Sequence, residues 1–391
     1  MQRRHFLDAT PAALDGALGV PTFTRAATPP EAPPASATTW RGQREIVPMR
    51  ASVDRIIDIS VCTRPFRAQG PRIESEHRSG KTIVHHYGHG GSGWSLSWGS
   101  ARVAMGLVLP HRPRHLAVIG SGAIGLTTAR VAQRAGLRVR IYCKERPPEV
   151  RSSSATGLWT PDSRLCSTAG MPTGFEAQWE AMARSSFKTY QSLLGLPGEP
   201  VEWRDGYALS DIPFDQPLLP VDDGEPDYPE LSSRLDDIHP KSQPLAPGEH
   251  PFHAPYVRRF TTMTFNIASY QRMLMEDFLR EGGEIETREF FHPREFGTLR
   301  ESVIVNCTGY GARALLGDES IIPVRGQTAR LVPQPAVDYL VVYRGHNLVA
   351  VPRRDGILVA TQESTDFGNI ETGIDRGVSE RAVERLGVLF A

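Results

Sequence analysis

The sequence has few cysteines and no long apolar run, and each shortage excludes a class of protein. Its four cysteines are far apart and include no C-x-x-C pair, which is atypical of a disulfide framework and of a structural zinc site. No stretch approaches the roughly twenty uninterrupted apolar residues that a membrane-spanning helix requires. We therefore expect a globular chain with ordinary thiols, no metal centre and no membrane span. The cysteines are Cys62, Cys143, Cys166 and Cys307.

An excess of charge of either sign is also missing. Lysine plus arginine and aspartate plus glutamate each number 44, and the isoelectric point is near 7.2. Such a chain has no net field that would attract nucleic acid or an anionic membrane, so a small-molecule substrate is favoured. A length of 391 residues is sufficient for two intimately packed domains or one large one.

Residues 1–40 differ in composition from the rest of the chain. The pair Arg3-Arg4 precedes a mildly apolar, alanine-rich stretch and then the Pro/Ala-rich run 28–37, an order that resembles a bacterial twin-arginine export signal. We expect an export signal with a linker, which would carry the protein to the periplasm or outside the cell. A plain tail on a cytoplasmic protein is the alternative, because Asp8 and Asp15 interrupt the apolar region.

A dinucleotide-binding unit is predicted in the middle of the chain. The apolar run 115–119 leads into Gly120-x-Gly122-x-x-Gly125, and a helix-compatible stretch (126–136) and a second apolar run (138–142) follow. The glycines permit a tight turn, close approach of a diphosphate and close helix–strand packing, while the helix N-terminus offers free N–H groups.

An acidic residue suited to a ribose hydroxyl completes this unit. Glu145 stands twenty residues after the last glycine, in the place that such a contact requires. We expect Ile124 and Lys144, beside these motif residues, to contact the dinucleotide as well. A simple glycine turn between packed elements is the structural alternative, and the ordered strand, helix and strand disfavour it.

The loop 151–161 is rich in hydroxyl groups and glycine. Hydroxyls and free amides can hold phosphate oxygens, and Gly157 lets backbone approach a flat ring. The loop resembles the segment of D-amino-acid oxidases that runs beneath the flavin, where Gly-Leu-Trp follows a Thr/Ser-rich turn. The resemblance implies FAD rather than NAD and these contact residues: Ser152, Ser153, Gly157, Leu158 and Trp159.

A second resemblance to D-amino-acid oxidases lies ahead of the nucleotide motif. Thr63-Arg64-Pro65 and the run 83–99, which contains H-H-Y-G-H-G-G-S-G, resemble the family's C-terminal R-P strand and H-N-Y-G-H-G-G-x-G turn. The resemblance implies that Arg64 binds the substrate carboxylate, for which a planar guanidinium is well suited. It also implies a turn and helix that contact the flavin through Gly90, Gly91, Gly93, Trp94 and Ser95. A loose His/Gly-rich loop is the alternative.

The later motifs resemble the same family in its usual order. Asn306-Cys-Thr308-Gly309 is similar to the end of a strand that runs close to the nucleotide, 323–327 to an R-G-Q turn, and 349–352 with 356–359 to paired strands of a sheet. The resemblance therefore implies contacts of Thr308 and Gly309 with FAD. The chain ends after a helix-like stretch (378–390), where the family would continue into its R-P strand, so we expect a circular permutation with residue 391 near the strand 55–61.

The resemblance implies an α/β fold with a Rossmann-type FAD-binding domain and a second α+β substrate domain on a mixed sheet. The expected segments are 1–40 (signal and linker), 50–110 (displaced block), 114–175 (FAD-binding βαβ and flavin loop), 176–300 (substrate domain), 301–330 (return to the FAD-binding domain) and 331–391 (substrate domain, remainder).

The substrate region is the least regular part of the sequence. We expect helices at 175–194 and 267–280, a strand at 256–264, and a long loop over the substrate side at 205–255. A tyrosine near this strand usually assists the arginine in the resembled family. Tyr256 is the candidate, with core packing as the alternative, because a one-residue slip in register reverses the face of a strand.

The implied reaction is oxidative deamination of a D-amino acid. In the resembled family the α-hydrogen passes as a hydride to flavin N5, no obligatory general base is needed, and O2 reoxidises the flavin to give hydrogen peroxide, a 2-oxo acid and ammonia. Three alternatives stay open: a glycine- or sarcosine-type amine oxidase, a flavin-binding protein without turnover, and, less favoured by the motifs, an NAD-dependent dehydrogenase.

Overall fold

The computed structural model describes residues 46–218 and 224–390, all within one compact unit. The predicted export signal therefore lies outside the described residues. The helices are α1 (Gly93–Val108), α2 (Ala123–Arg134), α3 (Phe175–Gln191), α4 (Ile267–Arg280), α5 (Gly311–Leu316) and α6 (Arg376–Val388). The strands are β1 (Ile56–Arg67), β2 (Arg72–Arg78), β3 (Lys81–Tyr87), β4 (His115–Ile119), β5 (Arg138–Cys143), β6 (Val201–Ser210), β7 (Gln243–Leu245), β8 (Tyr256–Phe265), β9 (Glu284–Thr287), β10 (Val303–Asn306), β11 (Ile321–Leu331), β12 (Leu340–Tyr343), β13 (Leu348–Arg353) and β14 (Gly356–Thr361).

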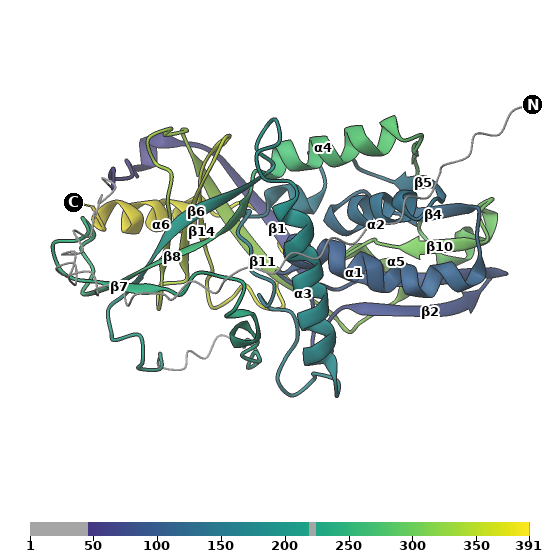
Figure 1. Ribbon diagram of the computed structural model, residues 1–391, viewed down its shortest axis with the longest axis horizontal. Coiled ribbons are helices and arrows are strands. Elements are labelled where there is room, and N and C mark those ends of the chain that lie inside the picture. Colours follow the sequence, from purple (N-terminus) through teal and green to yellow (C-terminus); the bar gives the residue numbers. More distant parts are fainter. Residues whose placement is uncertain (1–45, 219–223, 391) are drawn as a thin grey trace, which may run out of the picture. The chain divides into compact units, whose positions relative to one another are not determined.

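A six-stranded sheet in the order β2-β3-β10-β4-β5-β9 carries the predicted nucleotide motif. Its strands are parallel except for β2, which pairs antiparallel with β3. The inner strands β4 and β10 are nearly continuous runs of buried residues, as expected where helices cover both faces of a parallel sheet. Helices α1 and α2 pack against each other, and α2 packs on β4 and β5 (Figure 1). The predicted strand–helix–strand unit is therefore confirmed.

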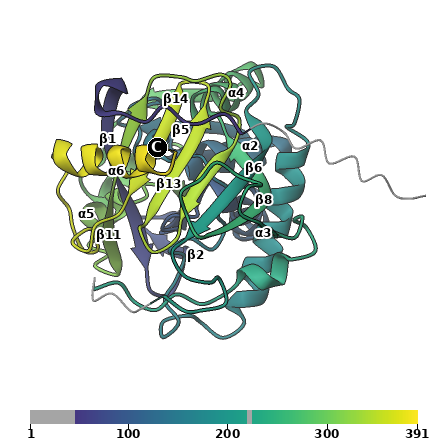
Figure 2. The same cartoon turned by 90° about the vertical axis from the view of Figure 1, so that its left-hand side faces the viewer.

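The second sheet is mixed and has eight strands, in the order β1-β11-β14-β13-β12-β6-β8-β7. Its neighbouring strands are antiparallel except for β12 and β6. Helix α6 lies across β13 and β14 and buries Val383 and Leu386 against them (Figure 2). The expected mixed sheet and the expected pairing of 349–352 with 356–359 are thus present.

The displaced block divides between the two sheets. Strand β1 is an edge of the mixed sheet, where Arg64 lies opposite Val324 of β11. Strands β2 and β3 and helix α1 join the nucleotide-binding sheet instead. The displaced block, expected at 50–110, therefore contributes strands to both sheets and links them.

Several expected boundaries differ from the structure. The segment 205–255 is not wholly a loop, since its first residues complete β6, whose pattern of one buried face is obscured by Arg204 and Asp205. The expected R-G-Q turn at 323–327 lies within β11 and pairs with β1 along its length, whereas on its other side only Gln327 pairs with β14 and Val324 bridges Phe367. Strand β9 belongs to the nucleotide-binding sheet and β11 to the mixed sheet, so the expected segments 176–300 and 301–330 each contribute to both sheets.

The last described helix ends beside the first described residues. Leu386 and Leu389 share one apolar cluster with Met49, and a side chain added at Gly387 would meet the Ala51 carbonyl oxygen at 2.6 Å. The C-terminal end of the described chain thus packs a few residues ahead of β1.

Candidate active site

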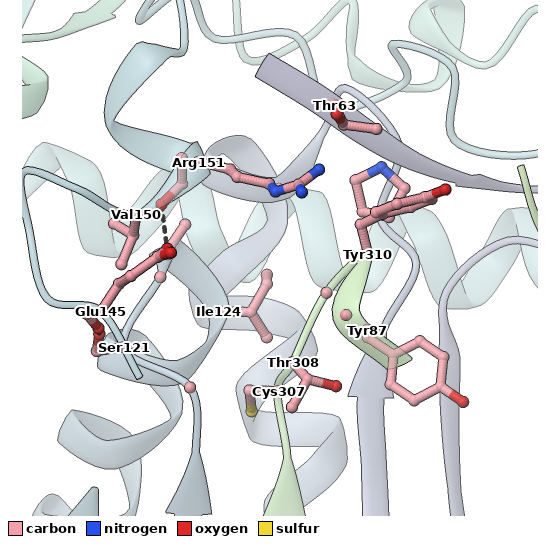
Figure 3. A pocket seen from close by; sticks show the side chains of 18 of the residues that line it. Thr63, Tyr87, Ser121, Ile124, Glu145, Val150, Arg151, Cys307, Thr308 and Tyr310 are labelled. Carbon is pink, nitrogen blue, oxygen red and sulfur yellow. Dashed lines mark hydrogen bonds between the residues drawn. The ribbon is translucent and has the colours of Figure 1, made fainter. Parts of the chain in front are cut away.

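A cavity of about 490 Å³ opens at the carboxyl ends of β3, β4, β5 and β10, the position at which open α/β sheets bind their ligands (Figure 3). Its walls come from five parts of the chain: the block before the nucleotide motif, the motif with its loop, the segment after β9, the segment after β10, and Thr328 of β11. It brings together thirteen predicted site residues: Arg64, Gly90, Gly91, Gly93, Trp94, Gly120, Gly122, Ile124, Lys144, Glu145, Ser152, Thr308 and Gly309.

The glycine motif forms a tight cradle below the cavity. Gly120 has a φ of +105°, and a Cβ added there would lie 2.6 Å from the Cys307 carbonyl oxygen. A Cβ on Gly125 would lie 2.0 Å from the carbonyl oxygen of Gly120, so Gly125 shapes the turn from within the helix and does not line the cavity. The N-terminus of α2 follows, where the Ala123 N–H donates to Ser152 Oγ at 3.0 Å. This arrangement provides a diphosphate site.

The ribose end of the predicted site is solvent-exposed. Glu145 follows β5, and its carbonyl oxygen accepts a hydrogen bond from Ser121 Oγ at 2.6 Å. Its carboxylate lies 3.7 Å from Lys144 Nζ, which is also 3.6 Å from the Glu289 carboxylate. The Glu145 carboxylate is therefore held at the cavity edge and is available to a ligand hydroxyl.

The start of α1 connects the displaced block to the predicted flavin loop. Trp94 lines the cavity and donates from Nε1 to the Ser152 carbonyl oxygen at 2.9 Å. Ser95 is buried outside the cavity, where its Oγ accepts from the Thr160 N–H at 2.8 Å. These bonds fix the helix N-terminus against the loop that runs from Ser152 to Thr160.

Arg64 extends from β1 into the same cavity. Its Nη1 donates to the Arg325 carbonyl oxygen at 3.0 Å, and a Cβ on Gly326 would lie 2.6 Å from both terminal nitrogens. Glycine at 326 therefore leaves the space that the guanidinium occupies. Thr63 and Thr328 also line this end of the cavity. An arginine so placed can bind a carboxylate through two parallel N–H groups.

Two buried histidines leave polar atoms unsatisfied at the cavity wall. His89 is 2% exposed, and neither of its ring nitrogens has a hydrogen-bond partner among the residues that the structure describes. His86 Nδ1 bonds Thr128 Oγ1 at 2.9 Å, while its Nε2 has no partner. Burial lowers the pKa of His89 to about 3 and lowers that of His86, so both rings are neutral near pH 7. Buried polar atoms of this kind require a partner, and FAD, with its polar ring edge and chain, fits this lining.

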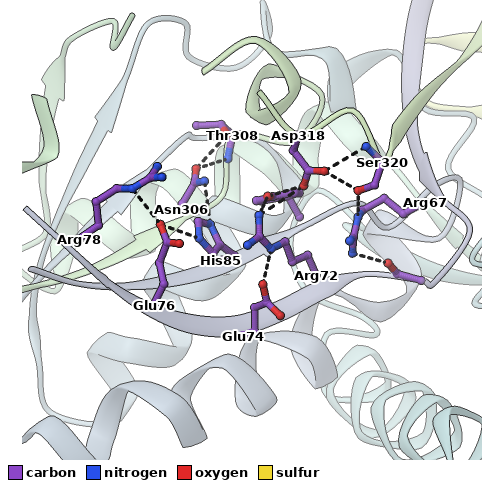
Figure 4. A network of polar contacts seen from close by, with 12 residues as sticks. Arg67, Arg72, Glu74, Glu76, Arg78, His85, Asn306, Thr308, Asp318 and Ser320 are labelled. Atoms are coloured by element: carbon purple, nitrogen blue, oxygen red, sulfur yellow. Dashed lines mark hydrogen bonds and ion pairs between the residues drawn. The ribbon is translucent and has the colours of Figure 1, made fainter. Parts of the chain in front are cut away.

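A chain of polar contacts supports Thr308, which lines the cavity (Figure 4). Asn306 Oδ1 accepts from the Thr308 N–H at 3.3 Å and from Thr308 Oγ1 at 2.8 Å. The Asn306 amide nitrogen therefore faces His85 Nδ1, 3.3 Å away, which must act as the acceptor. The proton of neutral His85 is then on Nε2, 3.4 Å from a Glu76 oxygen, and burial lowers the His85 pKa. This chain fixes Thr308 at the cavity.

The other predicted contact residues of the flavin loop, Ser153 and 157–159, lie outside the cavity lining, although Ser154, Ala155 and Thr156 belong to it. The Gly157 carbonyl accepts from the Phe265 N–H at 2.7 Å and Leu158 pairs with Thr264, so this part of the loop extends the mixed sheet. Trp159 is buried against Phe187 instead. Ser153 Oγ donates to Gln271 Oε1 at 2.9 Å. The contacts of these residues with FAD remain predictions.

The structure does not place Tyr256 in the site. This residue is 41% exposed at the first position of β8, whereas the following Val257 is buried in the core. It is eight residues from Thr264, the partner of Leu158, a separation of roughly 26 Å along a strand. Strand alternation turns its ring to solvent, so the expected substrate contact is not supported.

Other residues at the cavity were not identified from the sequence. Arg151 and Tyr310 project toward one another from opposite walls (Figure 3), and Tyr87 belongs to the apolar cluster against which Tyr310 packs. Arg151 is the first residue of the predicted flavin loop, and a basic residue in a phosphate-binding loop is the feature that could have marked it as a ligand-binding residue. Tyr310 follows the N-C-T-G motif directly, but no spacing rule marks an aromatic residue there.

No helix among the described residues is both long and apolar enough to cross a membrane. Groups of three or more histidine, cysteine, aspartate or glutamate side chains that could hold a metal are likewise not found among residues 46–218 and 224–390.

Comparison with known proteins identifies the family. The chain is 26% identical over 282 residues to the D-amino-acid oxidase of Dictyostelium discoideum, covering 70% of this chain and 72% of that protein. It is 27% identical over 276 residues to the D-amino-acid oxidase of Rubrobacter xylanophilus, covering 70% and 76%. Among solved structures, the iminodiacetate oxidase of Chelativorans sp. BNC1 has a TM-score of 0.48 at 14% identity, covering 70% of this chain and 78% of that one.

A family profile described as "DAO: FAD dependent oxidoreductase" matches residues 115–390 and leaves the displaced block outside the match. Because this match covers more than half of the sequence, from β4 through α6, the chain belongs to this family of FAD-dependent oxidoreductases, and its cofactor is FAD.

Proposed function

We propose that the protein catalyses oxidative deamination of D-amino acids to 2-oxo acids, with release of ammonia and hydrogen peroxide. The observation that carries this proposal is the position of Arg64, which projects into the cavity that contains the nucleotide cradle. A carboxylate bound there lies within the same cavity as the cofactor. The D-amino-acid oxidases among the relatives support the choice of substrate.

The residues of this chain contribute binding and orientation. Arg64 holds the substrate carboxylate, and Thr63 and Thr328 lie beside it. His86 and His89 are neutral because burial lowers their pKa values, so they add no cation that would compete for the carboxylate. FAD bound in this cavity would supply the hydride acceptor for the substrate α-carbon, and O2 would reoxidise the flavin. Catalysis then depends on alignment and electrostatics rather than on a general base.

Substrate oxidation under anaerobic conditions tests the proposal. We expect a panel of D-amino acids to bleach the flavin absorption of the purified protein, and air to restore it with release of peroxide. L-amino acids, glycine and sarcosine serve as comparison substrates. Bleaching only by glycine or sarcosine would assign an amine oxidase instead, and no bleaching by any of them would favour a flavin-binding protein without turnover.

We also propose that the chain is circularly permuted, with residues 46–111 supplying the segment that D-amino-acid oxidases carry at their C-terminus. The family match begins only at residue 115, and Leu389 packs in one cluster with Met49. A gene that starts at residue 112 and joins residue 390 to residue 46 through a short linker should fold and bind FAD with nearly unchanged affinity. A matched chain opened within β11 should not fold. Failure of the first chain with every linker length would contradict the proposal.

Export is a further proposal, supported by the Arg3-Arg4 pair and the composition of residues 1–40. A reporter fused behind residues 1–40 should leave the cytoplasm of a host with a twin-arginine pathway, and an Arg3→Lys, Arg4→Lys version should stay inside. Retention of both would favour a plain tail.

A further inference from the structure

Arg151 and Tyr310 meet across the mouth of the cavity. Arg151 begins the short 3-10 turn 151–154 after β5, whereas Tyr310 precedes α5 on the far side of β10. The Arg151 guanidinium carbon lies 5.1 Å from the centroid of the Tyr310 ring, a cation–π contact. Figure 3 shows both side chains pointing toward one another above Ile124 and Thr308. The pair therefore spans the space above the nucleotide cradle.

Among the described residues that line the cavity, Arg151 is a cation whose guanidinium has no hydrogen-bond or ion-pair partner. The lining carries four cationic side chains and two carboxylates, which leaves an excess of positive charge. Lys144 lies within 4 Å of both carboxylates, Arg288 donates to Thr298 and Arg64 donates to a backbone carbonyl. Within residues 46–218 and 224–390, the Arg151 guanidinium makes no hydrogen bond or ion pair, so its donors are available to a ligand anion.

The backbone of Arg151 is close to the predicted diphosphate site. The next residue, Ser152, accepts a hydrogen bond from the first N–H of α2 at 3.0 Å. The guanidinium and the helix N-terminus therefore border the same part of the cavity from two sides. Both favour a doubly charged diphosphate there.

Tyr310 is anchored independently of Arg151. Its ring packs against an apolar cluster of Tyr87, Ala312 and Ile321, and Tyr87 donates a hydrogen bond to Asp318 at 2.7 Å. Because the Tyr310 ring is held in place, the long and flexible Arg151 side chain packs against a fixed surface. This contact thereby reduces the conformational entropy that Arg151 would lose on binding an anion.

We propose that Arg151 is a binding residue for the diphosphate of FAD, and that Tyr310 is a positioning residue that holds its guanidinium over the cradle. The proposal concerns the cofactor alone and does not depend on which substrate the enzyme oxidises.

FAD affinity of the full-length chain tests this role. The bound flavin is removed, and FAD is titrated by its fluorescence at several salt concentrations. We expect Arg151→Gln to raise the Kd of FAD roughly 10- to 100-fold, the range for loss of a charge-assisted hydrogen bond, and to weaken its dependence on salt. Arg151→Lys should retain part of the affinity. Tyr310→Phe should bind as the wild type does, because the ring remains, and Tyr310→Ala should bind several-fold more weakly.

Two controls separate a diphosphate contact from a general effect. Arg146→Gln removes another exposed arginine, between β5 and the turn 151–154, which does not line the cavity and donates to Thr287. This variant should leave the Kd unchanged. ADP and adenosine are then titrated as competitors. Arg151→Gln should weaken ADP and leave adenosine unaffected. Equal weakening of both, or a Kd for FAD within twofold of the wild-type value at every salt concentration, would overturn the proposal.

Discussion

Substitution of Gly326 by alanine provides a direct test of the substrate arginine, because it moves Arg64 without removing it. A Cβ at this position would lie 2.6 Å from Nη1 and Nη2 of Arg64 and 2.7 Å from its Cζ. Contacts between such atoms are normally about 3.5 Å or longer, so the guanidinium must move by roughly 1 Å. The atoms that must move are the end of a flexible side chain, and the backbone at 326 does not have a positive φ. We therefore expect the fold to accept the alanine.

The displaced guanidinium would lose its bond to the Arg325 carbonyl oxygen and its alignment with a bound carboxylate. A charge-assisted hydrogen bond contributes about 1.5–3 kcal/mol, which corresponds to a roughly 10- to 100-fold weaker interaction. If the carboxylate is held equally in the ground state and the transition state, this loss raises KM and changes kcat little. We predict that Gly326→Ala raises KM for D-amino acids by this factor while FAD binding is retained.

Peroxide release at varied D-amino-acid concentration gives KM and kcat, and flavin absorption with thermal unfolding gives cofactor content and stability. Gly106→Ala is the matched control, because Gly106 is exposed on α1 and an added Cβ would meet no atom within 4 Å. An unchanged KM in Gly326→Ala, with normal FAD content, would refute the assignment of Arg64 as the carboxylate ligand. A loss of FAD together with substrate affinity would show that the substitution disturbs the whole cavity.

Three further predictions follow from the site. Gly125→Ala should weaken FAD binding and lower the free energy of unfolding by about 1–3 kcal/mol, because the added Cβ would meet the Gly120 carbonyl oxygen at 2.0 Å and overpack the turn. An unchanged melting temperature in calorimetry would argue against the tight cradle. Burial lowers the pKa values of His86 and His89, so below about pH 6.5 the unfolded chain binds more protons than the folded one. The free energy of unfolding should therefore fall as the pH falls, by up to about 1.4 kcal/mol per histidine and pH unit. Urea unfolding at several pH values should show a weaker dependence of this free energy on pH for a His86→Asn, His89→Gln variant. Tyr256→Phe should leave KM unchanged, because the ring is exposed and outside the cavity. A KM several-fold higher would indicate that Tyr256 does contact the substrate.

The sequence by itself determined the parts of the protein that depend on local spacing. The helix at 267–280 and the strand at 115–119 have the predicted bounds, because apolar periodicity, glycines and turns within a short window specify them. The glycine motif likewise placed its own residues at the carboxyl edge of the sheet, since a strand followed by a glycine turn and a helix has one stable arrangement.

Only the tertiary structure decided which distant residues meet. The contacts of Arg151 with Tyr310 and of His85 with Asn306 join residues about 160 and 220 positions apart, and no pattern along the chain relates them. The side to which Tyr256 points depends on the register of β8 with β6, which a one-residue shift would reverse. The space for Arg64 depends on a glycine of the neighbouring strand, because two strands must pair before a missing side chain can become a binding site.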